Sequence, residues 1–238
     1  MCTDVQNNLK FVLASIKEAA EQNQRSKTPL LVAVSKTKPS SMIQELYDIS
    51  QRHFGENYVQ ELEAKAVELA ESCPDICWHY IGTVQTNKIS KLAAIETLHC
   101  VEALTSIKHC SAFQSEMAKR DRKLRVMVQM NSSEEEQKGG GNEDECMEMA
   151  NFICKECSNL QFVGFMTIGS FERDPNEFND DFDALYKLRE KWCKAVGKDP
   201  KDFSLSMGMS NDYVQAIKQG SNQVRVGSSI FGGRVYKK

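Results

Sequence analysis

Lys36 closes a short apolar run that begins at Leu30 and is followed by Thr37-Lys38-Pro39. The run is rich in leucine and valine and is bounded by a proline, which predicts a buried strand with Lys36 as its last residue. Burial penalises a charged ammonium, and the neutral amine that it favours can attack a carbonyl carbon. A lysine at a strand end can also extend its stem to solvent. Position alone therefore leaves a nucleophile and a surface lysine both open.

Polar residues stand at the ends of other runs of this kind: Glu56, Asn57, Gln85, Asn87, Ser206, Ser210, Arg225, Gly227, Ser228 and Ser229. The last of these runs, Val-Arg-Val-Gly-Ser-Ser at 224–229, predicts a turn into a short helix whose outward N–H groups can bind a phosphate. A Gly-Ser turn that only ends a strand fits the same residues. Combined with Lys36, the phosphate interpretation indicates a Schiff base with a phosphorylated aldehyde.

The elements that must position these residues alternate along the chain. Eight runs predict strands, at 30–36, 53–57, 78–82, 98–102, 125–131, 162–169, 203–208 and 223–227. Helical spacing predicts helices between them, at 40–49, 61–69, 106–120, 143–157 and 178–192, and a leading helix at 5–20. This alternation predicts one (β/α)8 barrel over 1–238, with the leading helix in 1–24 and the barrel in 25–238. The carboxyl ends of its strands would form the active face.

Composition excludes several classes of partner. A net charge of −3 over 238 residues gives no electrostatic case for nucleic acid or an anionic membrane. No apolar stretch approaches the length of a membrane span, and the N-terminus resembles no signal peptide. Nine cysteines without a framework favour reduced thiols in the cytoplasm, with a mitochondrial share left open. The four histidines, 53, 79, 99 and 109, show no metal-ligand spacing, so we expect them to pack in the core or at the surface.

Five motifs identify a family that the chain resembles. They are Ala-Val-Ser-Lys-Thr-Lys-Pro at 33–39, Phe-Gly-Glu-Asn-Tyr-Val-Gln-Glu at 54–61, Trp-His-Tyr-Ile-Gly at 78–82 with Gln-Thr-Asn-Lys at 85–88, Leu-Ser-Met-Gly-Met-Ser at 205–210, and Val-Arg-Val-Gly-Ser-Ser-Ile-Phe-Gly at 224–232. Together they resemble the pyridoxal phosphate homeostasis proteins, also called proline-synthetase co-transcribed homologues, from about Leu30 to Tyr236. The resemblance implies an alanine-racemase-like barrel of PLP fold type III, without the second β domain of the racemase.

The resemblance also implies roles for six residues toward pyridoxal 5′-phosphate (PLP). Lys36 would form the Schiff base, and Asn57 would lie near the ring hydroxyl. Ser206, Gly227 and Ser228 would bind the phosphate, and Arg225 would face the pyridine nitrogen. The family commonly has Thr where this chain has Ser228, which preserves the hydroxyl. The glycines at 139–141 are also atypical.

Arg225 bears on whether the bound cofactor turns over. An arginine only donates hydrogen bonds, so it disfavours the protonated ring that assists carbanion chemistry. The racemases of this fold also have an arginine at this place and do turn over, so the arginine alone does not exclude activity. They take a second base from their β domain, however, for which the chain to Lys238 leaves no room. We therefore expect a monomeric carrier or buffer of PLP that serves apo-enzymes, with Lys38 and Lys138 as candidate helpers in transfer. A weak racemase or isomerase and a barrel aldolase are the alternatives. The 134–141 segment could be a lid or a solvated loop.

Overall fold

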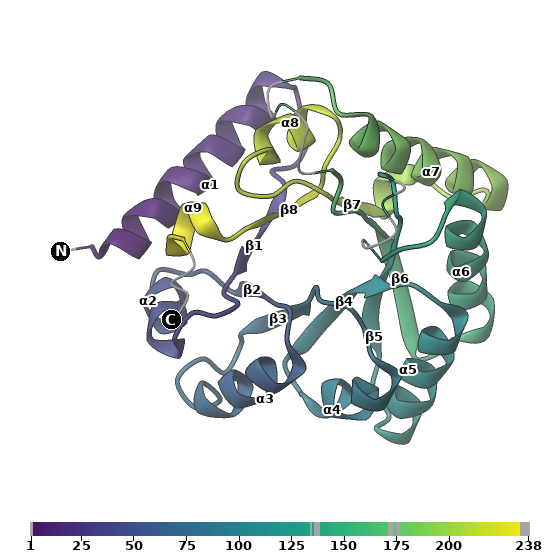
Figure 1. Ribbon diagram of the computed structural model, residues 1–238, viewed down its shortest axis with the longest axis horizontal. Helices are drawn as coiled ribbons and strands as arrows, with labels where there is room; N and C mark the ends of the chain where they lie inside the picture. Colours follow the sequence, from purple (N-terminus) through teal and green to yellow (C-terminus); the bar gives the residue numbers. More distant parts are fainter. Residues whose placement is uncertain (1, 134, 136–138, 171–173, 175–176, 234–238) are drawn as a thin grey trace.

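The protein, described here from a computed structural model, forms a closed barrel of eight parallel strands in chain order (Figure 1). The described residues are 2–133, 135, 139–170, 174 and 177–233. The strands are β1 (Leu30–Val34), β2 (His53–Glu56), β3 (Cys77–Tyr80), β4 (Leu98–Leu104), β5 (Leu124–Gln129), β6 (Leu160–Met166), β7 (Ser204–Ser206) and β8 (Gln223–Val226). The barrel closes between β1 and β8, where Leu30 pairs with Gln223 and Ala33 with Val226. The predicted fold class and all eight predicted strands are confirmed.

Helices form an outer ring around the barrel. They are α1 (Asp4–Gln22), α2 (Ser40–Tyr47), α3 (Val59–Glu68), α4 (Ile89–Ala94), α5 (Ile107–Lys119), α6 (Glu143–Glu156), α7 (Asp180–Val196), α8 (Tyr213–Lys218) and α9 (Ser228–Phe231). The sequence patterns missed α4 and α8, since six residues are too few to display a helical period. The predicted helices at 5–20, 40–49, 61–69, 106–120, 143–157 and 178–192 are confirmed, with small shifts at their ends.

The leading helix α1 occupies a place in the outer ring, between α8 and α2, with α9 against it (Figure 1). Its inward stripe is Val5, Leu9, Val12, Ile16 and Ala19, spaced at three and four residues. A capping box of Thr3 and Gln6 fixes its first turn. The leading helix thus covers a flank of the barrel.

Two apolar regions pack on the two faces of the sheet. The larger one lies between strands and helices and includes the fully buried Trp78, Phe165 and Trp192. The smaller one contains Cys100, Ala103, Met127, Val163 and Met166. Because Cys100 lies against the buried His79 and Glu102, we place this second region inside the barrel. Strands covered on both faces are expected to be nearly continuous in apolar residues, as these are.

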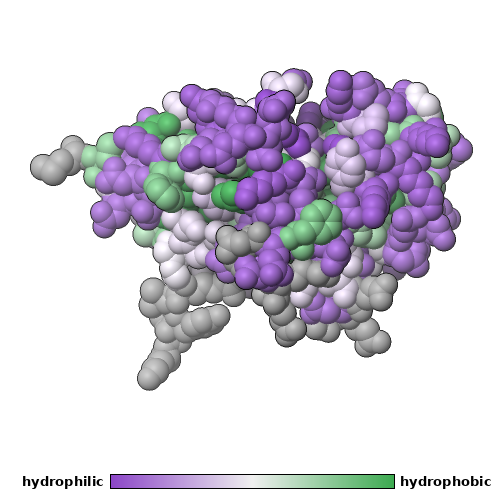
Figure 2. Space-filling view, turned by 90° about the horizontal axis from the view of Figure 1, so that it is seen from above, coloured by the Kyte–Doolittle hydropathy of each residue, from purple (hydrophilic) through white to green (hydrophobic). Residues whose placement is uncertain are grey.

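The outer surface is mostly hydrophilic on the face seen in Figure 2, where hydrophobic side chains form small, separated patches. Within the described residues, no helix is both long and apolar enough to cross a bilayer. All nine cysteines fall in described positions and none is in a disulfide, as the sequence predicted.

The first strand is shorter than predicted. β1 ends at Val34, and Lys36 lies in the turn that follows rather than at the end of the strand. The backbone leaves the sheet after Ser35, whose N–H still donates to the carbonyl of Gly55 on β2 at 3.0 Å. Because Lys36 lies in a turn and not in the strand, local contacts of the turn determine where its side chain points.

Candidate cofactor site

A cavity of about 710 Å³ opens where β1 and β8 end. Lys36, Arg225, Gly227 and Ser228, four of the six residues predicted from the sequence, line it. Volumes of this size are typical of small-molecule sites. The carboxyl ends of the strands, where barrel sites are expected, therefore do bring the predicted amine and the predicted phosphate turn together.

The turn that carries Lys36 is held in a strained shape. The N–H of Lys38 donates to the carbonyl of Ser35 at 3.0 Å, which closes the turn. Thr37 has a φ of 63°, in the left-handed region that β-branched residues rarely adopt. Its N–H donates to Glu61 Oε1 at 2.6 Å. Such strain persists only where neighbouring contacts fix the backbone, and here it directs the half-buried Lys36 to the cavity.

A buried ion pair between Lys65 and Glu56 also contacts this turn. Lys65 Nζ donates to the carbonyl of Ser35 at 2.8 Å and to Glu56 Oε1 and Glu61 Oε1 at 2.7 Å each. Burial raises the pKa of Glu56, although Lys65 and the Ser35 hydroxyl oppose that rise. Lys65 was not predicted as a site residue, because it stands inside the ordinary helical pattern of α3. Its only signal was a lysine four residues after Glu61 on a helix.

Asn57 comes directly after β2, next to the Lys36 turn in the barrel order. It is not among the residues that line the cavity, but its side-chain oxygen Oδ1 is buried and receives no hydrogen bond from any described residue. The backbone at Gly82 approaches it closely: a Cβ on Gly82 would lie 2.0 Å from the carbonyl oxygen of Asn57. Glycine at 82 is thus required to keep Asn57 in place.

Arg225 projects from β8 and is buried except where it meets the cavity. Its guanidinium donates to Ser206 Oγ and to the carbonyl of Thr167, each at 2.7 Å. Ser206 in turn donates to Glu102 Oε2 at 2.7 Å. Burial alone would raise the pKa of Glu102, but His79, Arg225 and Ser206 together lower it. Arg225 is therefore a fixed cation with a carboxylate behind it.

Ser206 has a different position from the one that its predicted phosphate role requires. It is fully buried behind Arg225 and does not line the cavity. Ser210 stands at the turn instead, where its Oγ accepts the N–H of Gly227 at 3.1 Å and that of Ser229 at 3.4 Å. Both serines lie at or just after the end of the seventh predicted strand, and the sequence does not show which of them points toward the cavity.

Of the two candidate helper lysines, Lys38 and Lys138, only Lys38 lies among the described residues. Lys38 lines the cavity, and its ammonium donates to the carbonyl of Gly233 at 2.8 Å. Lys138 lies outside the described residues, as does most of 134–138.

Comparison with known proteins places this geometry in a family. The model of the alanine racemase N-terminal domain matches residues 7–235. A pyridoxal phosphate homeostasis protein of Caenorhabditis elegans is 48% identical over 237 residues, which cover 98% of this chain and 97% of the relative. The chain belongs to the pyridoxal phosphate homeostasis proteins, within the alanine racemase N-terminal domain family. The resemblance drawn from the five motifs is thereby confirmed.

Two further members of this family are similar to this chain over most of its length. The human pyridoxal phosphate homeostasis protein is 45% identical over 215 residues, covering 88% of this chain and 78% of the human one. The structure of PipY from Synechococcus elongatus PCC7942 with PLP bound superimposes with a TM-score of 0.75 at 27% identity, covering 91% of this chain and all of that one. A barrel of this family can thus hold the cofactor.

Proposed function

We propose that this protein binds PLP in the cavity at the carboxyl ends of its strands and acts in PLP homeostasis. One observation carries the proposal: the Lys36 amine, the Arg225 guanidinium and the Gly227–Ser228 turn share one cavity. An aldehyde, a pyridine ring and a phosphate need an amine, a polar partner and an anion cradle, respectively. The solved PipY complex, from the same family, supports the choice of PLP.

The residues present fit the cofactor. When bound, PLP supplies an electrophilic aldehyde, which Lys36 would hold as a Schiff base. Gly227 and Ser228, with Ser210 in place of Ser206, would cradle the phosphate. Asn57, which directly follows β2 beside the Lys36 turn, would lie near the ring hydroxyl. Arg225 would face the ring nitrogen, where it can only donate and so keeps that nitrogen unprotonated.

We infer a carrier or buffer rather than a catalyst. A guanidinium beside the ring nitrogen weakens the ring as an electron sink, so the site favours holding the cofactor over transforming an amino acid. The recipients would be apo-enzymes that require PLP, and the carrier would act as a monomer. Unpaired thiols suit the reducing cytoplasm.

The test is to add PLP to the purified full-length protein, reduce it with borohydride, and map the modified peptide by mass spectrometry. We expect one reduced adduct on Lys36 and none in Lys36→Ala. Lys119→Ala, a surface lysine on α5, is the control and should keep the adduct. An adduct that persists in Lys36→Ala at another lysine of the cavity, such as Lys38, would show that the amine is assigned wrongly.

A weak racemase is the second candidate, because the family model is that of a racemase barrel. The same preparations decide between the two. Steady racemisation of an L-amino acid by the PLP-loaded wild type, lost in Lys36→Ala, would replace the carrier assignment. Retention and release of PLP without turnover would support the carrier assignment.

A further inference from the structure

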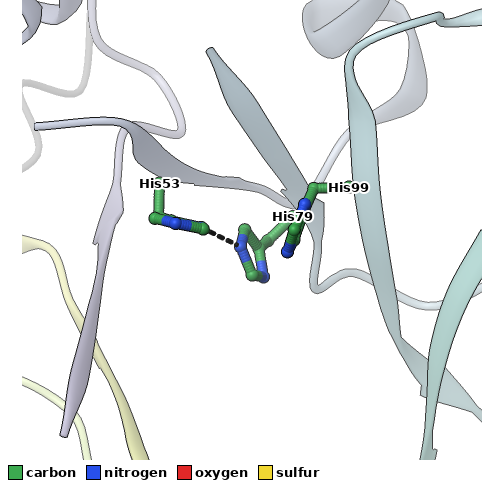
Figure 3. Close-up of side chains that lie close together, drawn as sticks. All are labelled: His53, His79 and His99. Carbon is green, nitrogen blue, oxygen red and sulfur yellow. Dashed lines mark hydrogen bonds between the residues drawn. The ribbon is translucent and has the colours of Figure 1, made fainter. Parts of the chain in front are cut away.

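Three histidines meet at the amino end of the barrel, opposite the PLP cavity. His53 is the first residue of β2, His79 lies within β3, and His99 is the second residue of β4. These strands are neighbours, and their imidazoles converge (Figure 3). Ring centroids are 5.1 Å apart for His53 and His79, 5.1 Å for His53 and His99, and 5.2 Å for His79 and His99. The sequence predicted packing roles because the three lie far apart along the chain.

The nitrogen atoms are close to the spacing that a metal ion requires. In a tetrahedral site with metal–nitrogen bonds of 2.0–2.1 Å, two ligand nitrogens lie about 3.3 Å apart. His53 Nδ1 and His79 Nε2 are 2.9 Å apart, and one nitrogen from each of the three rings lies within 4.8 Å of the other two. Rotation of the His99 ring could bring one of its nitrogens closer to the other two. None of the described residues hydrogen-bonds to that ring, so the rotation breaks no hydrogen bond.

A buried carboxylate orients the central imidazole. Glu102 Oε1 lies 2.6 Å from His79 Nδ1, and the same carboxylate accepts hydrogen bonds from Gln223 at 2.6 Å and Ser206 at 2.7 Å. An ionised Glu102 accepts a hydrogen bond from the Nδ1–H of His79, in the tautomer whose Nε2 carries the lone pair that faces His53. This is the arrangement that carboxylates give to metal-binding histidines, fixing the tautomer and raising ligand basicity.

The other two rings are reachable and neutral. His53 and His99 are partly exposed, whereas His79 is 1% exposed. Burial, with the nearby His79 and Arg125, lowers the pKa of His53 and of His99 to about 4, so both are uncharged at neutral pH. Arg125, which is exposed, places a positive charge near both rings, and the buried Glu102 offsets it.

We propose that His53, His79 and His99 form a binding site for a divalent transition-metal ion of borderline softness, with Zn²⁺ as the reference ion. Three imidazoles suit zinc, copper or nickel, whereas Mg²⁺ and Ca²⁺ prefer oxygen ligands. Coordination requires His53 to carry its proton on Nε2, so that Nδ1 can bind. That is a change of tautomer and releases no proton. A water molecule would fill the fourth position.

The experiment titrates Zn²⁺ alone into the full-length protein, freed of metal with EDTA and kept reduced, by calorimetry. We expect one Zn²⁺ per chain in the wild type. Loss of a ligand should weaken binding more than loss of an outer partner does, so we expect at least about 100-fold for His53→Ala or His99→Ala and about 10- to 100-fold for Glu102→Gln. His109→Ala, a histidine on α5 outside the cluster, should bind as the wild type does. Binding that the two alanine variants leave intact, or no binding at all, overturns the site.

Two measurements keep the outcome decisive. Co²⁺ in place of Zn²⁺ distinguishes imidazole from thiolate ligands, because cobalt–thiolate bonds absorb strongly in the near ultraviolet. Anomalous diffraction at the zinc edge from wild-type crystals needs no variant to fold. A peak between the three rings supports the site, and a peak only at cysteine sulfur contradicts it.

Discussion

Lys65 is the residue on which the setting of Lys36 most depends. It is 5% exposed, its partner Glu56 is fully buried, and together with Glu61 they hold both sides of the Lys36 turn. A buried pair of this kind adds little net stability compared with apolar residues, but removal of one partner leaves an uncompensated charge. Single and paired substitutions at 56 and 65 should therefore differ sharply.

We predict that Lys65→Met lowers the free energy of unfolding by about 3–5 kcal/mol, because Glu56 is left buried without its cation. The double variant Glu56→Gln/Lys65→Met should recover a large part of this loss. Lys91→Met is the control: its ion pair with Glu63 is exposed, and its removal should change the free energy by less than about 1 kcal/mol. Urea unfolding measures all three. Equal losses for Lys65→Met and Lys91→Met would contradict the buried-pair account.

Among the helices and strands, caps and close backbone contacts fix the positions of the residues at the loop ends. The loop after β5 re-enters the fold at Gly141, whose N–H donates to the carbonyl of Gln129 at 3.0 Å. Asn142 then begins α6 with a capping box, in which Asn142 and Glu145 bond to each other's backbone N–H groups. The far end of the 134–141 segment is thus anchored, whichever role that segment has.

We predict that Asn142→Ala lowers the free energy of unfolding by about 1 kcal/mol, because the Glu145 N–H loses its acceptor at the helix start. Asn142→Asp keeps an acceptor oxygen and should lose much less. Thermal or urea unfolding of the two variants decides the matter. A loss as large in Asn142→Asp as in Asn142→Ala would mean that the cap does not contribute.

At the scale of the whole molecule, buried thiols make the fold sensitive to alkali. Burial raises the pKa of Cys110 and Cys146 to about 12, from an ordinary value of 9. In the unfolded chain both thiols ionise near pH 9, whereas in the folded chain they stay protonated. The unfolded state therefore binds fewer protons above pH 9. The stability that these thiols contribute is complete below pH 9 and is lost as the pH rises toward 12.

We predict that the free energy of unfolding falls between pH 8 and pH 10, with about 1.4 kcal/mol of the fall from each of these two thiols. The double variant Cys110→Ala/Cys146→Ala should show a correspondingly smaller fall, even though its cavities make it less stable at pH 8. Ile43→Ala, which removes buried apolar volume but no thiol, should keep the wild-type pH dependence. Urea unfolding under reducing conditions at the two pH values tests this; identical pH dependences would refute it.

The order of apolar and amphipathic segments along the chain is enough to predict the barrel and the chemistry at its strand ends. Eight apolar runs alternate with amphipathic segments, and parallel strands need crossover connections and cover on both faces. A closed (β/α)8 barrel meets both needs. Lys36, Arg225, Gly227 and Ser228 could be predicted to meet because residues at the carboxyl ends of parallel strands, and those just after them, share one edge. That rule depends only on where each strand ends, which local patterns show.

Which side chains contact one another could be read only from the folded chain. Ser210, and not Ser206, accepts hydrogen bonds at the Gly227 turn. Lys65 donates to the backbone of the Lys36 turn, although the sequence of its helix shows no unusual pattern. The fold also brings together His53, His79 and His99 from three strands. Each of these facts depends on strand register and on the direction of a side chain across the barrel. Register follows from the packing of the whole sheet, so no local stretch of sequence contains it.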